Sequence, residues 1–144
     1  LLREVAPRLY VGSALAAGSV PGWPVPTVHL SAQCPRSDDA LRVLIEDRAA
    51  VPSEATDRVL SFARVARGHD QRPLLLQCYA GLSRSAAMAY AVLRVVDGLA
   101  HDEALARVAH DIEHADRTVR WPHHAVLDSV RAHCDAMTLR TVTP

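Results

Sequence analysis

The pattern of apolar and polar positions is most regular in the middle of the chain. Leu74–Leu76 form a run of three leucines that Pro73 precedes. A run this short, bounded by proline, predicts a buried strand and not a helix. Residues 83–97 are mostly strong helix formers, and Gly98 follows where helices commonly end. The pattern therefore predicts a strand, a turn and a helix in succession.

Comparable patterns on both sides of this unit predict further strands and helices in alternation. Strands are expected at residues 9–11, 25–32 and 41–45, and helices at 53–67, 102–115 and 122–139. Ser13 is expected to cap a short helix over 14–17, and Gly68 to end the helix that starts at 53. This order predicts an α/β fold with a small, mostly parallel sheet of about four to five strands and helices on both faces.

Length and charge narrow the classes of function. The chain has 144 residues and a mass of 15.6 kDa, so we expect residues 1–144 to form a single domain with its own core. The formal net charge is zero, which argues against nucleic acid or an anionic membrane as a partner. No apolar run approaches the roughly 20 residues of a membrane span. We expect a monomer.

Cysteine and arginine usage indicates the setting of the protein. The three cysteines, Cys34, Cys78 and Cys134, have no metal-site spacing and are too few for an even-numbered disulfide framework. Reduced thiols and a cytoplasmic location are therefore expected. All sixteen basic residues are arginine, and lysine and asparagine are absent, a bias typical of a GC-rich bacterial genome.

Candidate chemistry is concentrated in the turn between the strand at 74–76 and the helix that follows. The first N–H groups of a helix lack intrahelical partners and attract anions. Cys78 lies at the start of this turn, where a thiol readily ionises to a nucleophilic thiolate. Arg84 follows six positions later and can bind phosphate through two N–H groups. Together they provide what phosphoryl transfer requires.

The residue order in this turn is also specific. Five residues separate Cys78 from Arg84, Ser85 follows directly, and Ala80-Gly81 occupy the second and third positions after the cysteine. This loop resembles the signature of the dual-specificity branch of the cysteine-dependent protein tyrosine phosphatases. Val5 to Ser13 is similar to the segment that commonly opens those domains. The resemblance implies the compact phosphatase fold and hydrolysis of phosphomonoesters.

The resemblance assigns a role to each residue of the loop. Cys78 is the expected nucleophile, Arg84 the expected phosphate clamp, and Ser85 the group that stabilises the departing thiolate. The backbone amides expected to bind phosphate belong to Tyr79, Ala80, Gly81, Leu82, Ser83 and Arg84. No metal and no cofactor is expected.

The general acid is expected on a loop well before the cysteine. Asp47 is thirty-one positions upstream of Cys78 and follows the apolar pair Leu44-Ile45, which matches the place of the family's acid. Glu46 is the adjacent alternative and Asp38-Asp39 a more distant one. Proton donation to the leaving oxygen is the chemistry that this position must supply.

Three positions depart from the family pattern. Gln77 stands where the family has a histidine, and a glutamine can form hydrogen bonds but cannot carry charge. His29 replaces the usual asparagine of its strand, and Pro122-His123 replaces Pro-Asn. We therefore expect weakened activity, and a pseudophosphatase that binds phosphoproteins without turnover stays open as the alternative.

Two further signals have simpler explanations. Residues 110–114 read His-x-x-Glu-His, an inverted zinc-protease pattern on a predicted helix. No third ligand is identifiable, so surface histidines are the favoured interpretation. Relatives of the family imply that Cys34 is a candidate disulfide partner for oxidised Cys78, although an ordinary buried thiol is the commoner case. Cys134 is expected in the core.

The uncharged loop residues bear on the substrate. Tyr79, Ala80 and Leu82 add no positive charge beyond Arg84, whereas relatives that act on phosphoinositides usually carry extra basic residues there. A singly phosphorylated protein or peptide is therefore expected, with phosphotyrosine first and phosphoserine or phosphothreonine as further substrates. A small-molecule or lipid phosphatase is the remaining alternative. The arginines that flank the expected acid, and are candidates for substrate contact, are Arg36, Arg42 and Arg48.

Overall fold

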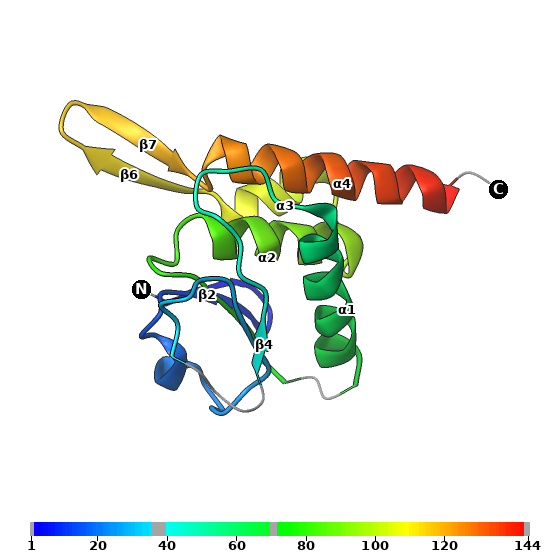
Figure 1. Ribbon diagram of the computed structural model, residues 1–144, viewed down its shortest axis with the longest axis horizontal. Coiled ribbons are helices and arrows are strands. Elements are labelled where there is room, and N and C mark those ends of the chain that lie inside the picture. The colour runs from blue at the N-terminus through cyan, green and yellow to red at the C-terminus, as the bar shows by residue number, and fades with distance from the viewer. Residues whose placement is uncertain (1, 36–39, 70–71, 143–144) are drawn as a thin grey trace.

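The protein is built on a five-stranded sheet with helices packed against it (Figure 1). The structure is a computed structural model, and residues 2–35, 40–69 and 72–142 are described. The strands of the sheet are β1 (Leu2–Ala6), β2 (Leu9–Gly12), β3 (Thr27–His29), β4 (Ala40–Arg42) and β5 (Leu74–Gln77). Their order in space is β1-β2-β5-β3-β4, so the predicted strand at 74–76 is the central one.

The pairing of the strands places the carboxyl end of β5 level with the carboxyl ends of its two neighbours. β5 runs parallel to β2 and β3, β3 runs parallel to β4, and only β1 is antiparallel to its neighbour. Gly12 and His29 both lie alongside Gln77, so three parallel strands end at the same level. Cys78 leaves the sheet at that level, and the carboxyl ends of parallel strands are where ligands bind in such folds.

One face of the sheet is covered by α-helices. Among the described residues these are α1 (Ser53–His69), α2 (Arg84–Val95), α3 (His101–Val108) and α4 (His124–Val142). α2 packs against β2 and β5 and also against the other three helices, and Figure 1 shows it between the sheet and α4. Residues 85–93 of α2 are all buried, which suits its alanine-rich sequence. Within the described ranges no helix has the length and apolar character needed to cross a membrane.

The opposite face of the sheet has a much thinner cover. Leu74 and Leu76 point into the main core with the helices, whereas Leu75 packs in a small cluster with Val20 and Val25. The 3-10 helix η1 (Ala17–Ser19) lies on this side and contributes Ala17 to the cluster. The predicted α/β fold, with a mostly parallel sheet and helical cover on both faces, is confirmed, but the two layers are very unequal.

The largest difference from the sequence-based prediction lies at residues 109–121. The helix predicted over 102–115 ends at Val108, and an antiparallel hairpin of β6 (His110–His114) and β7 (Arg117–Trp121) follows. Its turn lacks the Asn-Gly or Asp-Gly pair typical of two-residue hairpins, and Ala115 itself adopts a positive φ of 54°. The helical prediction is wrong here because no glycine signals the turn.

The other predicted elements are present, with different ends. The predicted strands at 25–32 and 41–45 are shorter, and β1 is an additional strand that begins at Leu2 and contains the charged pair Arg3-Glu4. The first long helix continues through Gly68, because a helix interior tolerates glycine at a cost of about 1 kcal/mol. The short helix expected at 14–17 forms as η1 instead.

The central strand provides a test of the core. Leu76 is 0% exposed and Leu15 is 88% exposed, so the same truncation removes apolar burial at only one of them. We predict that Leu76→Ala lowers the free energy of unfolding by about 3 kcal/mol, whereas Leu15→Ala changes it by less than about 0.5 kcal/mol. Urea denaturation measures both, and equal losses would contradict the arrangement of β5.

Candidate active site

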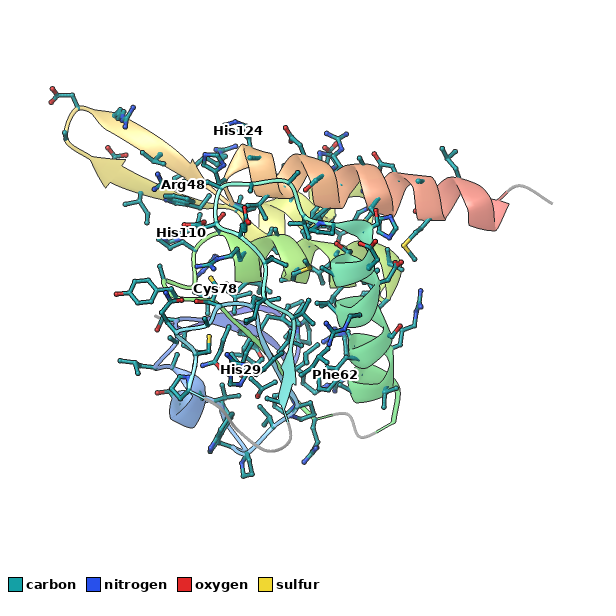
Figure 2. The ribbon with its side chains drawn as sticks, in the orientation of Figure 1. His29, Arg48, Phe62, Cys78, His110 and His124 are labelled. Atoms are coloured by element: carbon teal, nitrogen blue, oxygen red, sulfur yellow. The ribbon has the colours of Figure 1, made fainter. Side chains whose placement is uncertain are left out.

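The loop that joins β5 to α2 begins with Cys78, which is buried at the carboxyl end of the central strand (Figure 2). Cys78 is 2% exposed, and its backbone N–H donates a hydrogen bond to the carbonyl oxygen of Gly12 at 3.2 Å. Its thiol donates to the Ser85 hydroxyl, with a distance of 3.3 Å between Sγ and Oγ. The structure thus brings into contact Cys78 and Ser85, the two residues that the resemblance assigns to the nucleophile and to stabilisation of its thiolate.

Gly81 fixes the loop against the end of β2. Its φ is +74°, a conformation that glycine adopts without strain. A Cβ at this position would lie 2.7 Å from the carbonyl carbon of Gly12 and 2.7 Å from the backbone nitrogen of Ser13. The backbone N–H of Ala14 also donates to the carbonyl of Tyr79 at 3.1 Å. Glycine is therefore required here both by conformation and by space.

Gln77 holds the segment on which the loop packs. Its buried side chain donates from Nε2 to the carbonyl oxygens of Ser13 at 3.1 Å and Ala14 at 3.5 Å. A neutral amide supplies these hydrogen bonds, in the position where the family resemblance implies a histidine. Gln77 therefore tethers the segment after β2 but brings no positive charge to the site.

Arg84 links the loop to the segment that carries the predicted acid. Its Nη1 donates to the carbonyl oxygen of Ile45 at 3.3 Å, which leaves other N–H groups of the guanidinium for a ligand. Glu46 and Asp47 follow Ile45 and are both exposed. The carboxylate of Asp47 forms no hydrogen bond or ion pair with the part of the chain that the structure describes. The residues named above that lie outside the described residues are Arg36, Asp38 and Asp39.

The loop is also anchored at the start of α4. The Ser83 hydroxyl oxygen accepts a hydrogen bond from the backbone N–H of His123 at 3.0 Å. Ser83 itself is 5% exposed, while Tyr79 is 62% exposed at the outer side of the loop. The Pro122-His123 pair, which departs from the family pattern, therefore reaches the loop through its backbone.

His29 and Cys34 are both buried. Burial lowers the pKa of the His29 imidazole and the charge of Arg42 lowers it further, so we expect a neutral ring at pH 7. Its Nδ1 has no hydrogen-bond partner among the described residues. Burial raises the pKa of the Cys34 thiol, and the nearby Cys78 acts in the same direction. Cys34 is a free thiol in this structure, and its pairing with oxidised Cys78 stays a prediction.

The metal-site pattern at 110–114 lies on the strand β6 and not on a helix. Across the described residues, no three or more histidine, cysteine or acidic side chains are grouped so that they could hold a metal ion. Cys134 is fully buried in the main core, and burial raises its pKa to about 11. The expectation that Cys134 is a core residue is confirmed.

Trp121 is a residue near the site that the sequence pattern does not indicate. The Arg48 guanidinium carbon is 6.0 Å from the centre of the Trp121 ring, which brings the loop after β4 next to the hairpin. Arg42, by contrast, donates a hydrogen bond to the carbonyl oxygen of Cys34 at 3.3 Å, so this contact lies within the protein. The β-branched and aromatic residues of 117–121 were the available signal for a strand here.

Comparison with known proteins identifies the fold. No protein-family model matches the chain, and no curated protein matches it. Among solved structures, human DUSP28 is 28% identical with a TM-score of 0.74, and the match covers 95% of each chain. A mouse protein described as a dual specificity phosphatase, in complex with zinc tungstate, is 26% identical with a TM-score of 0.77, covering 99% of this chain and 92% of that one. In its fold the chain is similar to these dual-specificity phosphatases.

The dual-specificity phosphatase fold also includes more distant neighbours. The human tyrosine phosphatase-like serine/threonine/tyrosine-interacting protein is 18% identical with a TM-score of 0.73, over 96% of this chain and 97% of that one. That level of identity establishes a shared fold only. The more similar structures are phosphatases by their descriptions, so the fold supports phosphatase activity in general terms.

The close contact of Gly81 provides a test that separates site geometry from stability. Gly98 has a similar φ of +76°, but a Cβ there would meet nothing within 4 Å. We predict that both Gly81→Ala and Gly98→Ala lower stability by about 1 kcal/mol or more through backbone strain. Only Gly81→Ala is expected to weaken the binding of inorganic phosphate, by about tenfold or more, because its Cβ displaces the loop. Calorimetric titration measures the affinity, and equal affinities in the two variants would contradict this geometry.

Proposed function

We propose that the chain is a metal-independent phosphatase that hydrolyses phosphomonoesters on proteins through a cysteinyl-phosphate intermediate. The observation that carries the proposal is the contact between Cys78 Sγ and Ser85 Oγ at the start of α2, whose first residue is Arg84. The N–H groups at the N-terminus of a helix attract a phosphate dianion, and Cys78 lies next to them in the loop. Nucleophile and anion site therefore coincide.

In the first step, the Cys78 thiolate attacks phosphorus. A sulfur–phosphorus bond forms while the bond from phosphorus to the ester oxygen breaks. Asp47 donates its proton to that departing oxygen, which leaves as an alcohol or phenol. The Arg84 guanidinium and the backbone amides of residues 79–84 stabilise the charge on the three remaining oxygens.

In the second step, water attacks the phosphoenzyme. Asp47, now a carboxylate, accepts a proton from the water as an oxygen–phosphorus bond forms. The sulfur–phosphorus bond breaks, inorganic phosphate leaves, and the Ser85 hydroxyl donates a hydrogen bond to the Cys78 thiolate. No redox change occurs and no group beyond water is consumed. The exposed position of Asp47, two residues after the carbonyl that Arg84 contacts, supports this role.

The proposed substrate is a singly phosphorylated protein or peptide, with phosphotyrosine first and phosphoserine or phosphothreonine as further substrates. Tyr79, Ala80 and Leu82 contribute no charge, so the loop supplies one guanidinium for one phosphate. The proposal includes a single catalytic domain that acts as a monomer. It also includes a cytoplasmic location, which the three free cysteines favour.

A phospho-binding pseudophosphatase is the second candidate, and Gln77 is the observation that favours it. The neutral amide of Gln77 keeps the tether to Ser13 and Ala14 but adds no charge that would stabilise a thiolate. A human protein with the same fold is described as phosphatase-like and as interacting with serine, threonine and tyrosine. We favour the enzyme because the Cys78 thiol contacts the Ser85 hydroxyl and because Arg84 contacts the segment that carries Asp47.

The proposal is tested by p-nitrophenyl phosphate hydrolysis. We predict that turnover is unchanged by EDTA and falls on the order of 10³-fold or more in Cys78→Ser, because a hydroxyl is a far weaker nucleophile than a thiolate. If the wild type binds a phosphopeptide without any turnover, the enzyme proposal is wrong and the chain is a pseudophosphatase. Turnover that EDTA abolishes but Cys78→Ser retains would rule out the proposed chemistry.

The choice of general acid is tested by leaving-group dependence. Asp47→Asn is expected to slow hydrolysis of phenyl phosphate by about 10²- to 10⁴-fold, because phenolate needs protonation. The loss should be much smaller with p-nitrophenyl phosphate, whose leaving group is stable without a proton. Glu46→Gln is the matched control and should show no such difference. A leaving-group effect in Glu46→Gln and not in Asp47→Asn would assign the acid to Glu46.

A further inference from the structure

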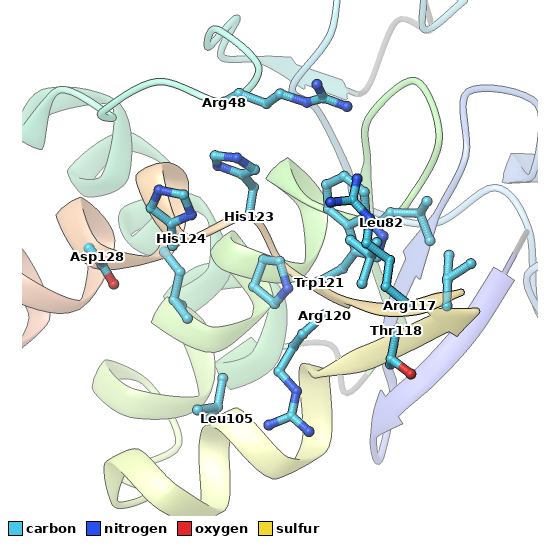
Figure 3. A pocket seen from close by; sticks show the side chains of 14 residues that line it. Arg48, Leu82, Leu105, Arg117, Thr118, Arg120, Trp121, His123, His124 and Asp128 are labelled. Atoms are coloured by element: carbon cyan, nitrogen blue, oxygen red, sulfur yellow. The ribbon is translucent and has the colours of Figure 1, made fainter. Parts of the chain in front are cut away.

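A second concave site lies next to the loop. It is a cavity of about 950 Å³, within the usual size range of ligand pockets. Figure 3 shows its walls, which come from the hairpin β6–β7, the start of α4, the segment at Arg48 and Leu82 of the loop. We call it the hairpin cavity. Neither Cys78 nor Arg84 lines it, so it is a neighbour of the reaction centre and not part of it.

The hairpin presents different chemistry on its two faces. Ile112 and Val119 lie opposite each other, as do His110 and Trp121, so these four residues share one face. The other face is polar, and its side chains bond one another. Arg120 binds Asp111 with distances of 2.9 and 3.1 Å, and Thr118 donates to Glu113 at 2.7 Å. The residues of the first face that line the cavity are Ile112, Val119, Trp121 and Arg117, which lies opposite His114.

No other element of the described chain fills the space in front of this apolar face. Figure 1 shows the hairpin extending away from the sheet and helices, with only its base near α4. A two-stranded hairpin alone is marginally stable in water and usually gains stability by packing on another element. The apolar face of the hairpin is therefore suited to a ligand that covers it.

Two arginines, Arg48 and Arg117, bring positive charge to the cavity. Arg48 stands over the Trp121 ring, and neither Arg48 nor Arg117 forms a hydrogen bond or ion pair with any residue that the structure describes. Arg120 pairs with Asp111, and Asp128 is the one carboxylate among the lining residues. Two free guanidinium groups and an apolar wall complement a ligand that is both acidic and apolar.

The cavity is continuous with the loop where phosphate is proposed to bind. Leu82 belongs to both, and the hydrogen bond from the His123 N–H to Ser83 joins the loop to the cavity wall. An extended peptide advances about 3.3–3.6 Å per residue, so residues next to a bound phosphoresidue are the ones that would reach the cavity. A small phosphomonoester would leave the cavity empty.

We propose that the hairpin cavity binds the part of a peptide substrate that flanks the phosphorylated residue, and that it selects a large apolar side chain accompanied by a carboxylate. This inference rests on the proposed function and adds the class of substrate sequence. The apolar side chain covers Ile112, Val119 and Trp121, and the carboxylate pairs with Arg117 or Arg48. A lipid acyl chain would leave both guanidinium groups unpaired, so a peptide fits the observed charges better.

The kinetic test compares two phosphotyrosine peptides and one small reference substrate. One peptide carries leucine and glutamate residues beside the phosphotyrosine, the other carries alanines, and p-nitrophenyl phosphate reports on the loop alone. We expect the acidic peptide to have the higher kcat/KM relative to the reference. Arg117→Gln should lower that ratio about fivefold for the acidic peptide and leave it unchanged for the alanine peptide. Arg120→Gln, on the same strand but paired with Asp111, is the matched control.

A binding measurement keeps the inference testable when the proposed turnover fails. Trp23 and Trp121 are the only tryptophans, so Trp23→Phe makes Trp121 the sole tryptophan, and its emission, excited selectively over tyrosine, reports on the cavity. The acidic peptide, with tyrosine unphosphorylated, should change Trp121 emission saturably, and Arg117→Gln should weaken that response. Absence of p-nitrophenyl phosphate turnover would overturn the proposed function alone. Equal responses to both peptides, or a response to anionic phospholipid vesicles and none to peptides, would overturn the cavity's assignment.

Discussion

The close approach of the Gly81 backbone to the end of β2 is the contact on which the site depends. An added Cβ would lie 2.7 Å from two backbone atoms, so the position admits hydrogen alone. With that contact in place, the Cys78 N–H reaches Gly12 and the Ala14 N–H reaches Tyr79. The loop is thereby fixed on one side by the sheet, and Ser83 fixes it on the other through the start of α4. A loop fixed in this way holds its other backbone N–H groups in place. Such preorganised donors stabilise charge without reorganisation during a reaction.

The sequence predicts the centre of the fold well, because the strand, loop and helix around Cys78 are adjacent in the chain. An apolar run, a glycine and an alanine-rich segment carry local signals that tertiary contacts do not alter. The residues that contact the loop are harder to predict from the sequence. Gln77 reaches Ser13 and Ala14 more than sixty positions away, and no pattern in one sequence encodes such a pairing. The role of Gln77 as a tether therefore comes from the structure.

The hairpin is the part that the sequence predicts least well. Residues 102–115 begin as a genuine helix, and its periodic pattern gives no warning that it ends at Val108. The turn uses Ala115 in place of glycine, so the usual hairpin signal is absent. Because the sequence does not predict the hairpin, it also does not predict the cavity or the position of Trp121. Likewise, Asp47 is placed by resemblance, and the structure adds that it follows the carbonyl held by Arg84.

The central claim is that phosphate passes through the Cys78 sulfur, and trapping the intermediate tests it most directly. Wild-type protein and the Cys78→Ser variant would be mixed with a phosphotyrosine peptide, quenched in acid within the first turnovers and digested for mass spectrometry. We predict one phosphate on the wild-type fragment that contains Cys78 and none on the corresponding fragment from the variant. Steady release of inorganic phosphate with no phosphate on Cys78, at quench times shorter than one turnover, would contradict it.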